Sequence, residues 1–410
     1  MLKRIFIVGL VFLSMLAACG SDEKSNNRPP TITPLPPTPV TTATVPSAAV
    51  QPTPTEAEVT PLDGHALGPD TAYLTIVMYG DFQSEICARY ARDLAELRAR
   101  YPDDLRLIWR HLPDIRTHDK AALALQASEA AAAQGKFWEM HDQLYTHQSE
   151  WAALSPEQFR ALLSDYAATV GLEVSRFNAE FDSYVALVDE ALRDAAELQL
   201  VAAPTLLYNG VPYNGRDDLF GLDEGVRLAL LEKRFFPHAP DITIDPMKSY
   251  RATITTDKGN IVIDLFPRDA PVAVNNFIFL AQNGWYNDIT FHYVVPGYLA
   301  QTGDPSNTGR GGPGYTIPDE HHNGLTFDRE GLVAMAHPAG IPNSAGSEFF
   351  ITLAPLRPAN EWDGQYTIFG MVVEGMEVVR SLTPRNANDP LRFPNPPPGD
   401  RVISITVEEF

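Results

Sequence analysis

Residues 291–305 read FHYVVPGYLAQTGDP and lie in a C-terminal region with a strong strand pattern. Upstream, residues 252–266 (ATITTDKGNIVIDLF) alternate in polarity and turn at Asp257-Lys258-Gly259, which predicts a hairpin. Residues 271–286 predict a helix with Pro271 in its first turn. Short strands and Gly-rich loops then alternate to the C-terminus, with one helical segment near residues 375–382. We expect a closed β-barrel flanked by two helices.

Five segments of this region resemble the cyclophilins, the peptidyl-prolyl cis-trans isomerases, in order and spacing: residues 291–305, 309–320, 331–336, 346–352 and 362–370. The resemblance implies an isomerase that acts on proline-containing polypeptides. It also assigns roles to single residues. The resemblance places the proline pocket on Tyr298, Leu299 and Phe350, with Tyr366 in the pocket wall. It implies that Gln301 holds the peptide near the rotating bond. It also implies that the backbone of Ala336 and His337 pairs with the substrate.

Three positions depart from the cyclophilin pattern. Tyr293 stands where the family usually has its catalytic arginine, and Glu348 stands where glutamine is usual. Glu361 stands where the family often has an aromatic residue. Trp362, the next residue, can take the place of that aromatic side chain if its own side chain points into the site. We expect Tyr293 to act as a weaker, neutral hydrogen-bond donor. The alternatives are that Tyr293 packs into the barrel, that the pocket residues are only barrel core, or that the domain binds proline peptides without catalysis.

The first folded region, residues 66–236, predicts an α/β domain of a different kind. A buried strand is predicted over residues 73–80, followed by a helix and a second strand over residues 105–110. Helical sequence follows, with breaks near Gly135, Ser155-Pro156 and Gly171. A strand and a hairpin are then predicted over residues 201–215. This order resembles a DsbA-like thioredoxin fold. The family's two redox cysteines fall on Ser84 and Cys87, and its cis-proline on Pro204. Because a serine cannot form a mixed disulfide, we expect a binding or spacer module without disulfide exchange.

The N-terminus predicts export. Lys3 and Arg4 precede an apolar run that is too short to span a bilayer, so residues 1–18 read as a signal peptide. The LAAC ending resembles a bacterial lipobox, which implies lipid attachment at Cys19; an ordinary or uncleaved signal is the alternative. Residues 19–65 are rich in Pro and Thr and predict a disordered tether. Residues 237–249 are expected to link the two folded domains, of which the second spans 250–410.

The amino-acid composition and net charge limit the classes of molecule that this protein is expected to bind. The 410 residues carry a formal net charge of −21, without a basic stripe, which argues against a nucleic-acid partner. The expected partners are proline-containing or unfolded exported polypeptides, together with a membrane through the lipid anchor, on the outer side of the cytoplasmic membrane. Neither a cofactor nor a metal is predicted. Two weaker alternatives are nucleotide binding by the GRGGPG loop at 309–314 and a metal site at Asp319–His322.

Overall fold

The computed structural model describes residues 64–386 and 398–410. The predicted signal peptide, Cys19 and nearly all of the tether lie outside these residues. Within the described ranges, no helix has both the length and the apolar character needed to cross a membrane.

The N-terminal domain is built on a five-stranded sheet with the order β1-β3-β2-β4-β5. Strands β2 and β3 are parallel, from Leu74 opposite Leu105 to Gly80 opposite His111, and the other pairs are antiparallel. The buried run LTIVMYG forms β2 at the centre of the sheet, as its continuous apolar character predicts. The strands are β1 (His65–Leu67), β2 (Leu74–Gly80), β3 (Leu105–His111), β4 (Thr205–Tyr208) and β5 (Val211–Pro212).

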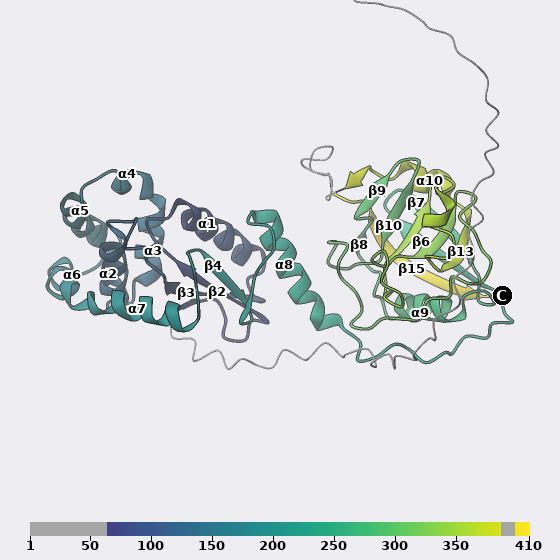
Figure 1. Ribbon diagram of the computed structural model, residues 1–410, viewed down its shortest axis with the longest axis horizontal. Helices are drawn as coiled ribbons and strands as arrows, with labels where there is room; N and C mark the ends of the chain where they lie inside the picture. Colours follow the sequence, from purple (N-terminus) through teal and green to yellow (C-terminus); the bar gives the residue numbers. More distant parts are fainter. Residues whose placement is uncertain (1–63, 387–397) are drawn as a thin grey trace, which may run out of the picture. The chain divides into compact units, whose positions relative to one another are not determined.

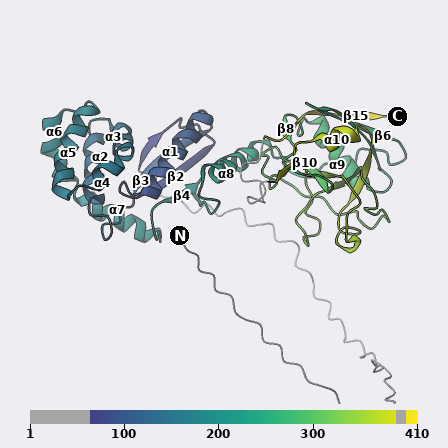
Figure 2. The ribbon, with the colours of Figure 1, turned by 90° about the horizontal axis from the view of Figure 1, so that it is seen from above.

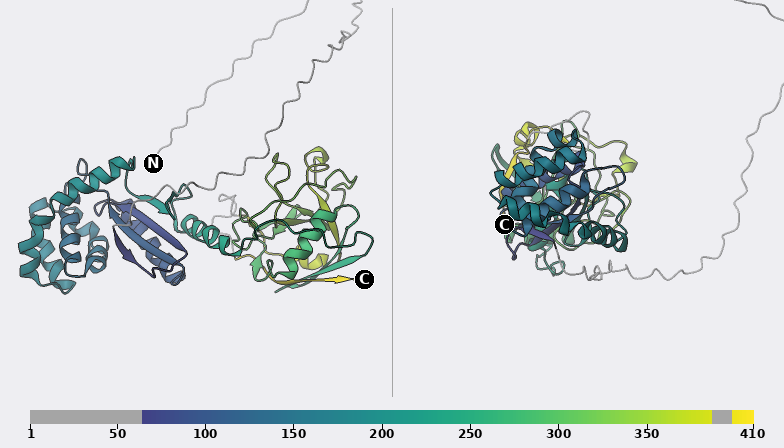
Figure 3. Two further views of the ribbon diagram at one scale, coloured as in Figure 1. Left: turned by 90° about the horizontal axis from the view of Figure 1, so that it is seen from below. Right: turned by 90° about the vertical axis from the view of Figure 1, so that its left-hand side faces the viewer.

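Helix α1 connects β2 to β3, and a group of helices connects β3 to β4 (Figures 1 and 2). The Ser84 side chain caps α1, and its buried residues Cys87, Tyr90, Leu94 and Leu97 recur at helical spacing. The helices after β3 form a cluster beside the sheet (Figure 3). The helical elements are α1 (Glu85–Arg100), α2 (Ala121–Ala132), α3 (Phe137–Thr146), α4 (Gln148–Ala152), α5 (Pro156–Thr169), α6 (Val174–Glu180), η1 (Phe181–Tyr184), α7 (Ala186–Glu197), α8 (Leu219–Leu231) and η2 (Glu232–Arg234).

The predicted helix breaks in this domain are confirmed. Gly135, with φ at +72°, lies between α2 and α3, and Gly171 lies between α5 and α6. Ser155 caps α5 through a capping box, with Pro156 as the first helical residue. The mixed α/β fold predicted for this part of the chain is therefore confirmed.

The C-terminal domain is a strongly curled antiparallel sheet of ten strands in the order β14-β9-β10-β12-β11-β13-β7-β6-β15-β8. Only Phe291 and His292 separate β8, at one edge, from β9, beside the other edge, so the curl must bring the two edges together. The strands are β6 (Tyr250–Thr256), β7 (Gly259–Leu265), β8 (Ile289–Thr290), β9 (Tyr293–Val295), β10 (Leu299–Thr302), β11 (Leu332–Met335), β12 (Phe349–Thr352), β13 (Ile368–Glu374), β14 (Arg385–Asn386) and β15 (Arg401–Glu409).

Two helices flank this sheet, as the sequence predicts. Helix α9 (Pro271–Gln282) begins at Pro271, and α10 (Met376–Ser381) lies at the opposite end of the curled sheet (Figure 1). The main core is enclosed by the sheet and includes the fully buried rings of Phe277, Trp285 and Tyr286. A short 3₁₀ turn, η3 (Ala359–Glu361), precedes Trp362.

Candidate active site

The candidate site begins with a row of residues across four neighbouring strands. In register, Tyr293 on β9 lies opposite Gln301 on β10, Gln301 opposite Phe350 on β12, and Phe350 opposite Ala334 on β11. Residues directly opposite each other in an antiparallel sheet point to the same face. This row therefore shares one face.

The face that carries this row is separate from the main core. Val294, Ala300 and Ile351, the sequence neighbours of the row, pack into the main core on the other face. Leu299, Ala334 and Phe350 belong instead to a second apolar cluster, against which Tyr298, Trp362 and Tyr366 pack. The pocket residues implied by the resemblance are thus gathered in one place, apart from the core enclosed by the sheet.

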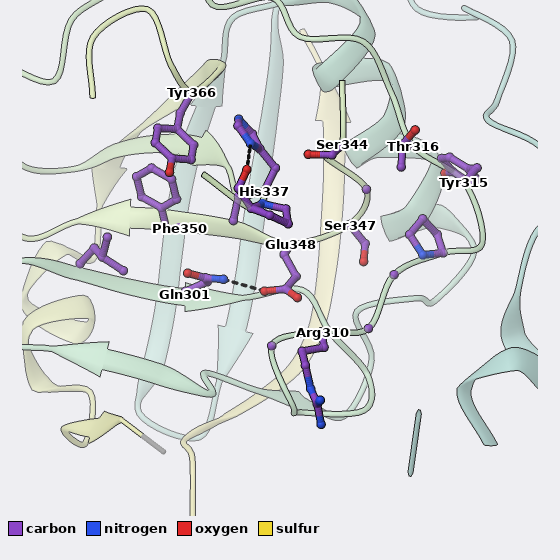
Figure 4. Close-up of a pocket in the computed structure, with 18 of the residues that line it drawn as sticks. Gln301, Arg310, Tyr315, Thr316, His337, Ser344, Ser347, Glu348, Phe350 and Tyr366 are labelled. Atoms are coloured by element: carbon purple, nitrogen blue, oxygen red, sulfur yellow. Dashed lines mark hydrogen bonds between the residues drawn. The ribbon is translucent and has the colours of Figure 1, made fainter. Parts of the chain in front are cut away.

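A cavity of about 520 Å³ opens on this face (Figure 4). Leu299, Phe350, Trp362 and Tyr366 give it an apolar, largely aromatic wall. The Trp362 ring stacks on Tyr366 with centroids 5.2 Å apart, and meets Tyr298 edge-on at 5.6 Å. The structure thus places Trp362 in the wall, while Tyr298 contacts the Trp362 ring and does not itself line the cavity. Such a wall suits a compact apolar ring.

Polar groups occupy the remainder of the cavity wall. The Gln301 Nε2 group donates a hydrogen bond to Glu348 Oε2 at 2.6 Å (Figure 4). Each ring nitrogen of His337 lies 3.0 Å from a backbone carbonyl oxygen, one of Pro338 and one of Gln365. The Ala336 N–H already donates to the Glu348 carbonyl at 2.9 Å, so Ala336 can pair with a peptide only through its own carbonyl oxygen.

Tyr293 is half-buried and packs against the second apolar cluster. Its side chain shares a face with Gln301, and the adjacent Val294 fills the main core, so Tyr293 is not part of the packing enclosed by the sheet. Tyr293 is also opposite Asn386 of β14 and does not line the cavity wall. A catalytic role for this hydroxyl stays a prediction.

The GRGGPG loop has an internal function that the sequence reasoning missed. The backbone N–H groups of Gly309, Arg310 and Gly311 all donate to Asp304 Oδ2, at 2.8, 3.3 and 3.1 Å. Burial alone would raise the pKa of the Asp304 carboxyl, but hydrogen bonds from Ser306 and the electrostatic effect of the nearby His292 lower this pKa overall. The loop thus cradles an anion, as phosphate loops do, but that anion is the protein's own carboxylate. The spacing of Asp304 before Ser306 and Thr308 is the sequence signal that could have revealed this role.

The residues predicted to form a degenerate redox site lie at the start of α1 and immediately before β4. Ser84 accepts a hydrogen bond from the Cys87 N–H at 3.3 Å, and the peptide bond between Ala203 and Pro204 is cis. Cys87 is fully buried, and burial raises the pKa of its thiol to about 11. Ser84 lines a second cavity of about 380 Å³ together with the segment around Val201 and Ala203. A thiol this buried and protonated is a poor nucleophile.

Potential metal ligands meet in a place that the sequence did not suggest. His65 Nε2 and His111 Nε2 each lie 2.7 Å from Glu129 Oε1, whereas within the described ranges residues 319–322 form no such group. The Trp109 ring N–H donates to His111 Nδ1 at 3.3 Å, which leaves the His111 proton on Nε2, facing Glu129. Hydrogen bonds within the protein therefore account for this cluster, and the two histidines help to lower the pKa of Glu129 to about 2 against the opposing effect of burial.

Comparisons with known proteins match both halves of the chain. The family model described as thioredoxin matches residues 60–224, and that of cyclophilin type peptidyl-prolyl cis-trans isomerase/CLD matches residues 251–406. Peptidyl-prolyl cis-trans isomerase-like 1 of Aspergillus fumigatus is 44% identical over 131 residues, which are 31% of this chain and 78% of the relative. A peptidyl-prolyl cis-trans isomerase of Helicobacter pylori is 40% identical over 152 residues, which are 34% of this chain and 90% of the relative.

Proposed function

We propose a function on the premise that this chain belongs to the family of the cyclophilin-type peptidyl-prolyl cis-trans isomerases, through residues 251–406. The proposed reaction is rotation about X–Pro bonds in exported polypeptides, as a folding aid. The observation that carries it is the cavity walled by Leu299, Phe350, Trp362 and Tyr366, with Gln301 beside it.

The chemistry that this pocket must perform follows from the amide bond. Resonance sets a barrier of roughly 18–20 kcal/mol to rotation, and the barrier falls when the prolyl nitrogen becomes pyramidal. An apolar pocket holds the ring and excludes water, while Gln301 restrains the peptide on one side of the turning bond. These contributions come from positioning and need no charged group.

We further propose that catalysis is weakened, not absent. Tyr293 offers one neutral donor where the family usually has a charged arginine, and charge-assisted hydrogen bonds are about twice as strong as neutral ones. A protein that only binds proline peptides is the second candidate, favoured by the same substitution.

The location that we propose is the outer side of the cytoplasmic membrane, through lipid on Cys19. Its support is the sequence of the N-terminus, where Lys3 and Arg4 precede an apolar run that ends in LAAC. We expect Cys19→Ser to be released from membranes or to remain as the precursor, measured by fractionation and labelling with radioactive palmitate. A variant that is processed and labelled like the wild type would rule out this anchor.

A protease-coupled isomerisation assay on the mature chain in detergent separates the two candidates. We expect acceleration of cis-to-trans rotation in a chromogenic Ala-Ala-Pro-Phe peptide, abolished by a cyclophilin-directed inhibitor. Saturable binding of the same peptide without acceleration would establish the binding protein instead.

A further inference from the structure

The side chain of Glu348 limits how the Gln301 amide can be oriented. Glu348 immediately precedes β12, lines the cavity, and has a side chain that is only 12% exposed. Its Oε2 atom accepts the hydrogen bond from Gln301 Nε2 at 2.6 Å. An ionised carboxylate has acceptors but no donor, so only the amide nitrogen of Gln301 can face it. The amide oxygen of Gln301 must then point the other way, as Figure 4 shows.

His292 lies next to the same carboxylate. Its ring is buried, and its Nε2 atom lies 3.2 Å from Glu348 Oε2. The loop that Asp304 organises closes over this ring, because a Cβ atom at Gly309 would lie 3.3 Å from His292 Nε2 and Cδ2. The Glu348 carboxylate thus lies close to both the Gln301 amide and the buried His292 ring, and of these two contacts only the one with Gln301 is a hydrogen bond.

We propose that Glu348 is a positioning residue that fixes the Gln301 amide, so that Gln301 Oε1 accepts an N–H from the peptide bound in the pocket. This inference rests on the proposed function and deepens it by naming the group that Gln301 presents. Turning the amide over would bring Gln301 Oε1 against the carboxylate, and two acceptors repel each other. A neutral glutamine at position 348 would tolerate both orientations and would leave part of the population presenting a donor.

A double-mutant cycle tests this coupling, because a residue that acts through the Gln301 side chain has no effect once that side chain is removed. The affinity of Ala-Ala-Pro-Phe for the mature chain in detergent is measured by calorimetry for the wild type, Glu348→Gln, Gln301→Ala and the double variant. We expect Glu348→Gln to weaken binding by about twofold to tenfold, the range of one hydrogen bond. In the Gln301→Ala background the same substitution should have no effect. Equal losses in both backgrounds, or no loss with Gln301 present, would overturn the proposal.

Two further variants guard against a purely structural effect. Glu408→Gln makes the same change on an exposed residue of β15 and should leave affinity unchanged. Glu348→Asp keeps the charge but shortens the reach to Gln301, so it should weaken binding as Glu348→Gln does; wild-type affinity in this variant would contradict the proposal. Isomerisation is followed on the same samples. A wild type that binds but does not accelerate rotation would end the proposed function, while the cycle would still decide the role of Glu348.

Discussion

The sequence predicts that each of the two domains of this chain lacks a residue on which catalysis would depend, and the two predicted losses differ in kind. At the N-terminal site Ser84 stands where a nucleophilic thiol is needed, beside a Cys87 that is fully buried. At the C-terminal site Tyr293 stands where the cyclophilin resemblance predicts arginine, and it packs against the apolar cluster that forms the pocket wall. Disulfide exchange passes through a covalent bond to sulfur, so no oxygen can replace it. Rotation of an X–Pro bond forms no bond to the protein.

This contrast indicates how the loss of one residue from an active site affects catalysis in the two kinds of mechanism. A mechanism that depends on one atom ends when that atom is removed. A mechanism that depends on positioning, exclusion of water and several hydrogen bonds loses one contribution at a time. We therefore expect an all-or-none response at Ser84 and a graded one at Tyr293.

Restoring the thiol should give the largest change. Burial raises the pKa of the Cys87 thiol to about 11, so this thiol is protonated at pH 7, and there is no second thiol at position 84. We expect no insulin reduction by the wild type and measurable reduction by Ser84→Cys, whose new thiol would lie at the N-terminus of α1. Ser84→Ala is the matched control. A wild-type activity that disappears in Cys87→Ser would contradict this contrast.

Asp304→Asn should destabilise the C-terminal domain by about 3 kcal/mol, because the buried carboxylate accepts hydrogen bonds from the whole loop. Its folded-state pKa is lowered from the usual 3.8, so its stabilising contribution is complete above that value and is lost as the pH falls through the folded-state pKa. Chemical denaturation from pH 7 to pH 2 should show the wild-type advantage narrowing only below about pH 4. An equal difference at all pH values would show that the charge is not responsible.

Substitutions of Tyr293 should have smaller effects than the two substitutions described above. We expect Tyr293→Arg to raise kcat/KM by about tenfold, since the loss of one transition-state donor elsewhere costs on the order of 10²–10³ and a tyrosine replaces part of it. Tyr293→Phe should lower kcat/KM by about threefold, with little change in peptide affinity. Thermal midpoints of both variants serve as the control for folding. A Tyr293→Arg variant that folds normally and gains nothing would remove this residue from the mechanism.

The sequence predicts the fold better than the contacts within the site. Alternating polarity in β6 and β7, Pro271 at the start of α9 and the breaks at Gly135 and Gly171 are local signals, so they can be recognised without a structure. The bond from Gln301 to Glu348 joins residues 47 positions apart, and its orientation depends on the sheet register. The anion held by the GRGGPG loop is likewise supplied from outside the motif, by Asp304. Such pairings follow from tertiary packing, which no short pattern encodes.

The most direct test of the central claim compares the pocket with the donor in one measurement. Exchange spectroscopy on a proline peptide reports the cis-to-trans rate with catalytic amounts of wild type, Tyr293→Phe and Phe350→Ala, each checked for folding by circular dichroism. If catalysis rests mainly on the apolar pocket, the wild type accelerates exchange, Tyr293→Phe keeps about a third of that acceleration, and Phe350→Ala loses nearly all of it. Full loss in Tyr293→Phe with wild-type exchange in Phe350→Ala, or no acceleration by the wild type, would contradict the account.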